Sequence, residues 1–500
     1  MTRRRVDIFA GALAPALALI LLVGSIVLGL VFLIAVGFGY LPALGGHTLS
    51  LEPIQLLLAD DRIVSSCART IFAGTSGTLA AVVVAFALAF VLDPTGAASA
   101  GWGHRLALAI LAVPHAALAL GLAFVIAPSG WVMRGLQAIV GAWALPPDWQ
   151  LFPAESGVAL ALVLFLKETP FLFFAIVIGL HQLRPERYLL AARALGYADG
   201  MAWMKLVLPR LYPLVRFPIL AVLAYSLSVI DMSLILGPTT PATLPVLILK
   251  WVNAPDLSQR FIAAAAALLQ FSLVAAAILA WWVGERSIAV LLRPWLSNGE
   301  RHWPHRIVLL GRCMLGLVTT VGTLLIVFSV GALLLWSLAQ AWRYPALLPA
   351  GFDLTTWHRS VDAVYAPLIE SLLLAISAAF LAILLSVGCL QHERVLRSDV
   401  VRSAERWLYL PLLVPEICFL LGLQILLLLL GLNGTWVAVL WMHFLFVFPY
   451  VFLTLKEPWR AFDPRYETVG HVLGQSSWRV FWRIKLPMLR APLSWAAAVG

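Results

Sequence analysis

The chain has 500 residues, of which 62% are hydrophobic and only 12% are charged, and its formal net charge is +10. Soluble globular proteins have about 45–50% apolar and about 25% charged residues, so this composition excludes an ordinary soluble domain and indicates an integral membrane protein. The net charge does not indicate nucleic-acid binding, because the basic residues lie in short segments between apolar runs and no RNA-binding motif accompanies them. The 4 cysteines are scattered, without metal-ligand spacing.

Apolar runs long enough to cross the hydrocarbon core as helices recur along the whole chain. The first run has about thirty residues, which is too long for the apolar region of a signal peptide. We predict helices over 8–39, 66–92, 104–127, 156–181, 211–236 and 261–283, then over 307–340, 367–390, 406–431, 434–455 and from 489 to the end. The apolar segment 131–145 is short, which is typical of a re-entrant or interfacial helix.

The distribution of lysine and arginine predicts the orientation of these helices. With the N-terminus inside, the cytoplasmic side receives most basic residues: arginines 3–5 and the clusters within 184–216, 286–312, 394–406 and 456–490. We therefore expect a multi-pass protein of the bacterial inner (cytoplasmic) membrane with a cytoplasmic N-terminus. The segment 237–260 is then an outside loop.

The chain also repeats itself. "RTIFAGTSGTLAAVVVAFALAF" from Arg69 resembles "ESLLLAISAAFLAILLSVGCL" from Glu370, at an offset of 301 residues. The sequence thus predicts an all-α membrane protein with two tandem homologous bundles of about six helices each. The first unit is 1–283, the cytoplasmic linker 284–306 and the second unit 307–500. The second unit stops inside an apolar run, so we expect it to be cut short at residue 500.

Two polar stretches between apolar runs match at an offset of 278 residues: "ARALGYADGMAWMKLVLP" from Ala192 and "GHVLGQSSWRVFWRIKLP" from Gly470. In the first, good helix formers follow a proline, and Gly196 can end the helix because glycine tolerates positive φ. Asp199 is expected to cap a second short helix, and Ser476 or Ser477 does so in the other stretch. Leu-Pro then ends each stretch, so both are predicted as helix–turn–helix elbows.

This arrangement resembles the EAA loop of bacterial ABC-importer permeases. The family pattern is Glu-Ala-Ala, three residues, glycine, nine residues, then Ile-x-Leu-Pro. In the first copy Leu190 replaces the glutamate, and the second copy lacks both the glutamate and the alanines. The spacing between glycine and Leu-Pro is intact in both copies. The resemblance covers both halves, and fused double permeases of this kind resemble the ferric-iron and thiamine importers.

The resemblance implies that each elbow is a coupling helix seated in a cleft of a cytoplasmic ABC ATPase, with two ATPase copies. It also implies a periplasmic or extracellular substrate-binding protein. The coupling residues would be Arg187, Tyr188, Ala191, Ala192, Gly196, Trp203, Leu208 and Pro209, with Arg465, Tyr466, Gly474, Phe481, Ile484, Leu486 and Pro487 in the second copy. No Gly-Lys dipeptide occurs, so the chain has no Walker A motif. We expect it to bind no cofactor itself, with ATP and Mg²⁺ on the partner, and to be a transport component rather than an enzyme.

Ionisable residues within apolar runs are candidates for the pathway, because charges at membrane depth are costly. The candidates are Lys167, Glu168, Asp231, His115 and Glu416. Structural pairing or snorkelling is the alternative for the first two, and a local cap for Asp231. The substrate stays open: oxygen ligands would suit ferric ion, whereas aromatic rings and a carboxylate would suit thiamine.

The alternative function is an ion-gradient-driven secondary transporter with parallel repeats. It explains the duplication and the intramembrane charges, but gives no reason for two matched cytoplasmic elbows. A membrane-embedded enzyme is disfavoured, because no nucleophile–base constellation or HExxH pair is present. The sequence therefore favours the permease subunit of an ATP-binding-cassette importer that forms the translocation pathway.

Overall fold

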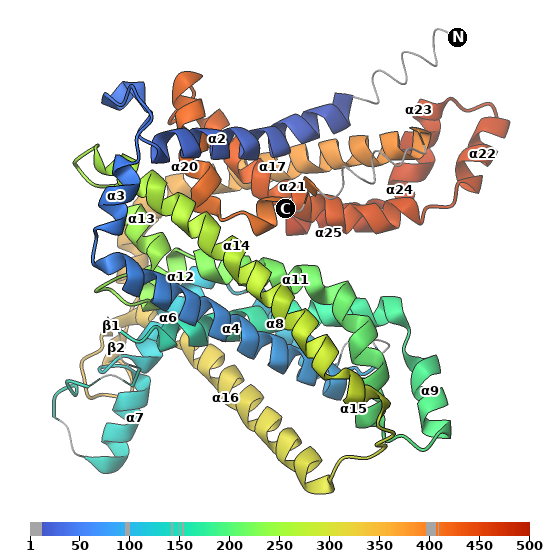
Figure 1. Cartoon of the computed structure of the whole chain (residues 1–500), viewed down its shortest axis with the longest axis horizontal. Helices are drawn as coiled ribbons and strands as arrows, with labels where there is room; N and C mark the ends of the chain where they lie inside the picture. Colours follow the sequence, from blue (N-terminus) through green and yellow to red (C-terminus); the bar gives the residue numbers. More distant parts are fainter. Residues whose placement is uncertain are drawn as a thin grey trace. The chain divides into compact units, whose positions relative to one another are not determined.

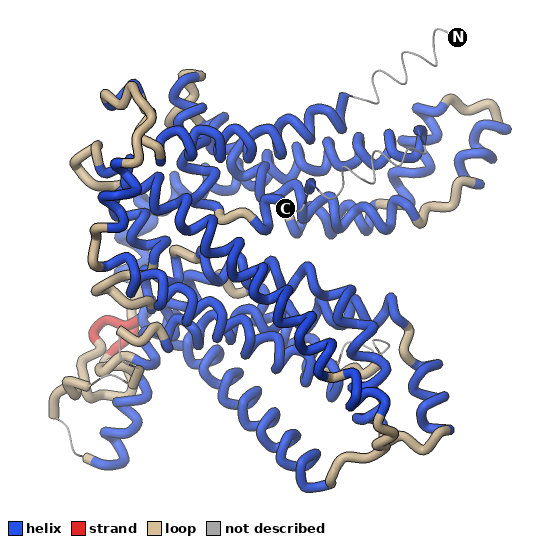
Figure 2. The backbone as a smooth tube through the Cα atoms, in the orientation of Figure 1, coloured by secondary structure: helices blue, strands red, loops and turns tan. Residues whose placement is uncertain are grey.

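The computed structural model describes residues 13–95, 101–141, 144–149, 151–152, 155–396, 407–408 and 410–500 (Figure 1). Helices dominate these residues, and the strands described among them are the short antiparallel pair β1 (Ala339–Ala341) and β2 (Gly351–Phe352) (Figure 2). Nine helical stretches within the described ranges are long and apolar enough to cross a membrane. The predicted all-α membrane fold is confirmed. The predictions for arginines 3–5 and for most of the 394–406 cluster lie outside the described residues.

The helices follow the apolar runs of the sequence. Up to the linker they are α2 (Ser25–Gly37), α3 (Glu52–Leu58), α4 (Arg62–Leu92), α5 (Trp102–Ala112), α6 (His115–Ile126), α7 (Trp131–Val140), α8 (Val158–Leu183), α9 (Glu186–Ala194), α10 (Asp199–Ala202), α11 (Leu208–Ser228), α12 (Asp231–Leu236), α13 (Leu244–Val252), α14 (Gln259–Leu291) and α15 (Arg293–Ser297). The remainder are α16 (His305–Leu338), α17 (Thr355–Leu396), α19 (Leu410–Leu413), α20 (Glu416–Leu429), α21 (Trp436–Arg460), α22 (Arg465–Val472), α23 (Ser477–Val480), α24 (Leu486–Met488) and α25 (Arg490–Val499).

Proline breaks two of the predicted helices at matched places. The prediction over 104–127 becomes α5 and α6, because Val113 is extended (ψ 126°) and Pro114 is the N-cap of α6. Proline lacks an N–H and disfavours the α conformation of the residue before it. Pro415 takes the same N-cap position before α20. Each proline therefore ends the helix completely, where the sequence predicted one continuous helix.

The segment after the fifth predicted helix also differs from expectation. The helix predicted over 211–236 ends at Ser228, and Asp231 begins the separate helix α12. The predicted outside loop 237–260 contains α13, most of which is buried. Two hydrogen bonds fix the start of this helix on α4: Arg69 Nη1 donates to the Pro241 carbonyl at 2.6 Å, and the Leu244 amide to Thr70 Oγ1 at 2.9 Å. Most of this segment is therefore part of the bundle.

The chain forms two compact units that do not coincide with the two halves of the sequence. Unit 1 comprises Met1–Val36 and Arg359–Gly500, and unit 2 comprises Gly37–His358. Helix α2, from the first half, thus packs with helices of the second half, whereas α16, from the second half, packs with helices of the first. Each half contributes its first long helix to the unit built mainly from the other half.

Matching contacts hold the two exchanged helices. In unit 2, α6 meets α16 where a Cβ on Gly121 would overlap the carbonyl oxygen of Ser329. In unit 1, α20 meets α2 where a Cβ on Gly422 would overlap the carbonyl oxygen of Gly29. Small residues permit such close approach of membrane helices. Since Gly121 and Gly422 match at the offset of the repeat, the same packing contact is made twice.

Candidate functional site

The two predicted elbows have the same local fold. The first elbow (186–209) consists of α9, a glycine turn, α10 and a π-helical turn over Trp203–Val207 that continues into α11. The second elbow (465–487) consists of α22, a glycine turn, α23 and a π-helical turn over Phe481–Lys485 that continues into α24. The two π-helical turns lie at the offset of 278 residues. Each elbow follows the end of a long helix, α8 or α21 (Figure 1).

Glycine ends the first helix of each elbow through the same hydrogen bonds. Gly196 has φ +84° and Gly474 has φ +75°. In the first elbow the Gly196 amide donates to the Arg193 carbonyl at 2.9 Å, and the Tyr197 amide to the Ala192 carbonyl at 3.0 Å. The equivalent bonds of the second elbow join Gly474 to His471 and Gln475 to Gly470, both at 3.0 Å. This is the Schellman motif, which favours glycine because other residues are strained at positive φ.

The second helix of each elbow begins differently. Ser476 is the N-cap of α23, and its hydroxyl accepts from the Arg479 amide at 3.4 Å, as one of the two predicted alternatives requires. The prediction that Asp199 caps α10 is wrong, because Ala198 is the N-cap and the aspartate is the first helical residue. Its carboxylate instead accepts from Arg193 Nε at 2.6 Å and Nη2 at 3.1 Å, which raises the pKa of the guanidinium.

The predicted coupling residues divide by exposure. Arg187, Tyr188, Ala191, Gly196, Pro209, Arg465, Tyr466, Gly474 and Pro487 are exposed, Leu208, Phe481, Ile484 and Leu486 are half-buried, and Ala192 and Trp203 are buried. Trp203 is only 3% exposed, and its Nε1 donates to the Pro94 carbonyl at 3.2 Å, so it anchors the elbow to the end of α4. The second elbow exposes a tryptophan instead, since Trp478 is 70% exposed.

The alanine missing from the second copy has a packing explanation. Gly470 occupies the position of Ala192 and faces the π-helical turn of its own elbow. A Cβ there would lie 2.7 Å from Val480 Cγ2 and 3.1 Å from Ile484 Cδ1. At this position the second elbow leaves less space for a side chain than the first, which accommodates the methyl group of Ala192. Glycine fits the smaller space.

Two buried lysines in the elbows were not among the predicted site residues. Lys485 is fully buried, and its Nζ lies 2.6 Å from Gln391 Oε1, 3.2 Å from Glu467 Oε1 and 4.6 Å from the ring centre of Trp459. Lys205 is 8% exposed and contacts the linker between the halves. The available sequence signal was a lysine among the apolar residues of the last turn of each elbow, joined in the second elbow by Arg483.

Lys167 lies at the break between α5 and α6. It is 2% exposed, and its Nζ donates to three carbonyl oxygens: Ile110 at 3.3 Å, Leu111 at 2.8 Å and Val113 at 2.5 Å. A helix end leaves its last carbonyls without intrahelical partners, and these need hydrogen bonds inside an apolar bundle. The geometry of Lys167 is therefore that of a residue that stabilises the break.

The other pathway candidates occupy three different places. Glu168 is buried, and its Oε1 lies 3.4 Å from Nε2 of His115, whose side chain is 39% exposed. The imidazole packs against the Tyr225 ring with 5.2 Å between centroids. Asp231 is the half-buried first residue of α12, and Glu416 is the exposed first residue of α20 in unit 1. Within the described residues no group of three or more His, Cys, Asp or Glu side chains is arranged to hold a metal ion.

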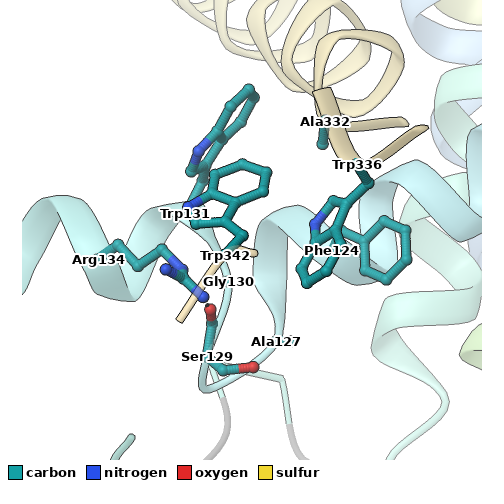
Figure 3. Close-up of a pocket in the computed structure, with 9 residues that line it drawn as sticks. All are labelled: Phe124, Ala127, Ser129, Gly130, Trp131, Arg134, Ala332, Trp336 and Trp342. Atoms are coloured by element: carbon teal, nitrogen blue, oxygen red, sulfur yellow. Dashed lines mark hydrogen bonds between the residues drawn. The ribbon is translucent and has the colours of Figure 1, made fainter. Parts of the chain in front are cut away.

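Another buried cation is Arg134 of α7, a helix that lies far from α9 of the first elbow (Figure 1). Its guanidinium donates to the carbonyls of Ser129 at 2.7 Å, Arg343 at 3.0 Å and Ala346 at 2.5 Å, and lies 5.2 Å from the ring centre of Trp342. Figure 3 shows Arg134 beside a small cavity whose aromatic lining is Phe124, Trp131, Trp336 and Trp342. Helix α7, predicted as a re-entrant or interfacial helix, thus holds the segment between β1 and β2 against the unit.

These features define a multi-pass membrane permease. The chain belongs to the permease proteins of bacterial ABC transporters, and it is a transport component rather than an enzyme. It is 29% identical over 458 residues to the inner membrane ABC transporter permease protein YnjC of Escherichia coli (strain K12), covering 90% of this chain and 79% of that relative.

The chain is also 30% identical over 189 residues to the transport system permease protein PhnV of Salmonella typhi, covering 36% of this chain and 69% of that relative. PhnV of Salmonella typhimurium matches equally well over 68% of its length. No protein-family model matches the chain. The inner-membrane relative and the apolar helices together identify a multi-pass protein of the bacterial inner membrane.

Proposed function

We propose that this chain forms the translocation pathway of an ABC importer and couples it to a separate cytoplasmic ATPase through the two elbows. The N-terminus and both elbows then lie on the cytoplasmic side. Two ATPase copies bind ATP and Mg²⁺, one copy docking on each elbow, and a substrate-binding protein delivers the solute from outside. The permease chain supplies no nucleotide site.

The occurrence of the same elbow in each compact unit carries this proposal. Both elbows have a Schellman glycine followed by a π-helical turn, and one belongs to unit 2 and the other to unit 1. Each unit thus has one attachment point for an ATPase copy. When the two ATPase copies close on binding ATP, they can act on both units together. Such closure would favour one of two packings of the units, and alternating access follows from switching between them.

We further propose that His115 and Glu416 line the pathway. They follow Pro114 and Pro415 at matched places of the repeat. The His115 side chain is 39% exposed and Glu416 is exposed, whereas Lys167 and Glu168 are buried. A pathway role predicts that His115→Ala changes the KM for solute uptake while assembly with the ATPase is retained. Unchanged uptake kinetics would exclude His115 from the pathway.

The coupling role is tested by purifying the tagged chain from its native membranes and identifying what accompanies it by mass spectrometry. Recovery of a P-loop ATPase is expected. The double variant Gly196→Val/Gly474→Val should lose that ATPase, because valine at positive φ breaks both helix ends. The matched control is Gly141→Val/Gly431→Val, which places valine at φ +68° and +67°, once in each unit and outside the elbows.

Retention of the ATPase by the elbow double variant, or its loss from the control to the same degree, would contradict the proposal. Solute uptake by vesicles under an ion gradient without ATP would support the gradient-driven alternative.

A further inference from the structure

The linker between the halves runs along the first elbow rather than away from it. Its first part is the end of α14, followed by α15, and residues 298–304 then lead into α16 (Figure 1). The Arg301 carbonyl accepts from the Ala198 amide at 3.0 Å, which joins the linker to the turn between α9 and α10. The predicted cytoplasmic linker is therefore bonded to the elbow through its backbone.

Side chains of the linker cover the same face of the elbow. The Arg301 guanidinium lies 5.8 Å from the ring centre of Tyr197. Trp303 Nε1 lies 3.1 Å from the sulfur of Met201, and this methionine is 2% exposed. The contacts thus extend from the glycine turn of the elbow into its second helix.

Lys205, in the π-helical turn, makes the strongest of these contacts. Its Nζ donates to Asn298 Oδ1 at 2.7 Å and to the Glu300 carbonyl at 3.1 Å, and it lies 5.1 Å from the ring centre of Trp295. The Asn298 side chain also accepts from the Glu300 amide at 3.1 Å, which holds the acceptors in place. A buried ammonium needs such partners, so removal of either side leaves polar groups unsatisfied.

The second elbow leaves the equivalent face exposed in the part of the chain that the structure describes. The positions that match Gly196, Ala198, Met201 and Lys205 are Gly474, Ser476, Arg479 and Arg483, and all four are exposed. The linker contacts are therefore a property of the first elbow and not of the elbow fold.

We propose that residues 295–303 form a strap that positions the first elbow and ties its movement to α16, with Lys205 as the positioning residue. The mechanical part of this inference rests on the proposed coupling role of the elbows. Only residues 298–304 separate α15 from α16. Such a segment spans at most about 25 Å when fully extended, so it limits how far α15 and α16 can separate. Displacement of the first elbow then acts on α16, and through the Gly121 contact on α6.

The strap itself is tested without any partner. The full chain is purified into lipid nanodiscs, and the rate of tryptic cleavage after Arg301 is measured, since the strap must open before a protease can bind it. Lys205→Met should accelerate this cleavage about tenfold, as expected for the loss of a buried charged contact. Lys205→Arg should restore most of the protection, because the cation is kept.

The control is Arg483→Met, the matched substitution on the second elbow, which should leave cleavage after Arg301 unchanged. Equal cleavage of wild type and Lys205→Met would overturn the assignment of Lys205. Faster cleavage in Arg483→Met as well would show a general loosening and would also overturn it.

The mechanical role is tested in proteoliposomes that contain the permease, its ATPase and its binding protein. Lys205→Met should still bind the ATPase and hydrolyse ATP, but should transport at least threefold less solute per ATP, with recovery in Lys205→Arg. If Lys205→Met opens the strap but transports as much solute per ATP as the wild type, the proposed link between the first elbow and α16 is overturned. If no ATPase binds the wild-type chain, the proposed function fails, whereas the cleavage result still decides whether the strap exists.

Discussion

The first and second elbows share a backbone but are held by different groups. In the first, Trp203 is buried against the end of α4 and Lys205 bonds to the strap. In the second, Lys485 bonds within unit 1, and Trp478 is exposed. The shared features are the Schellman glycine, the π-helical turn and Leu-Pro. The backbone shape can therefore be kept while its supports diverge, because each elbow packs against different neighbours.

The largest expected effect is a difference in folding stability between alanine variants of Trp203 and Trp478. Trp203→Ala should lower the free energy of unfolding by about 3–5 kcal/mol, because a buried aromatic side chain leaves a cavity. Its ring also packs against Phe90 with 5.3 Å between centroids. Trp478→Ala should change stability by less than about 0.5 kcal/mol, as surface substitutions generally do. Denaturant titration of both variants in the same micelles measures the difference.

Trp478→Ala should instead weaken ATPase binding, because exposed tryptophans are frequent anchors of interfaces. Equal stability of the two variants would mean that the first elbow is not packed around Trp203. Full ATPase affinity in Trp478→Ala would remove this side chain from the docking surface.

Lys485 gives the next largest effect. Lys485→Ala should destabilise unit 1 by about 3 kcal/mol, because it leaves its buried partners unpaired. Lys485→Met should also destabilise, because Gln391 and Glu467 lose the same charged partner, but by less than Lys485→Ala, since the longer side chain leaves a smaller cavity. The first elbow has no such pair, because the completely buried Val207 stands at the matched position. Hydrogen exchange of α22 and α25 measures both variants, and a Lys485→Met variant as stable as the wild type would contradict the pairing argument.

The elbows were predictable from sequence to the extent that their backbone depends on local residues. Glycine at a helix end and Leu-Pro before a membrane helix act within a few positions, so the turn and its repeat were visible. The lysine contacts were not, because Lys205 and Asn298 are 93 residues apart and Lys485 and Gln391 are 94 apart. Such contacts depend on which segments fold against one another.

The same distinction applies to the fold. Apolar runs located the long helices, but the predictions over 104–127 and 406–431 ran through the breaks that Pro114 and Pro415 make. The break after Ser228 was missed as well, and no proline or glycine marks it. The exchange of α2 and α16 could not be predicted, because an apolar helix has the same sequence pattern whichever unit it joins. The contact between Gly29 and Gly422 required the three-dimensional structure.

A smaller effect tests why the second copy departs from the alanine pattern. Helix propensity alone predicts that Gly470→Ala stabilises α22 by about 1 kcal/mol. The short distance from its Cβ to Val480 predicts the opposite, a loss of about 1 kcal/mol from overpacking. Ala192→Gly should also destabilise, because the first elbow has room for alanine and loses its helix propensity. Hydrogen exchange of α9 and α22 distinguishes these outcomes, and stabilisation by Gly470→Ala would refute the packing explanation.

The smallest expected effect is a difference in local stability between the N-terminal ends of α23 and α10, the second helices of the two elbows. Ser476→Ala should lower the local stability of α23 by about 1 kcal/mol, because it removes the N-cap hydrogen bond. Asp199→Ala should have a smaller effect on α10, since this carboxylate pairs with an exposed arginine and caps nothing. Salt discriminates the two causes: about 1 M NaCl screens an exposed ion pair but not a neutral cap. Hydrogen exchange of the elbows should therefore show a loss at Ser476→Ala that salt does not change, and a loss at Asp199→Ala that disappears in salt. A salt-insensitive loss at Asp199→Ala would restore it as the cap of α10 and make the two elbows alike at this position.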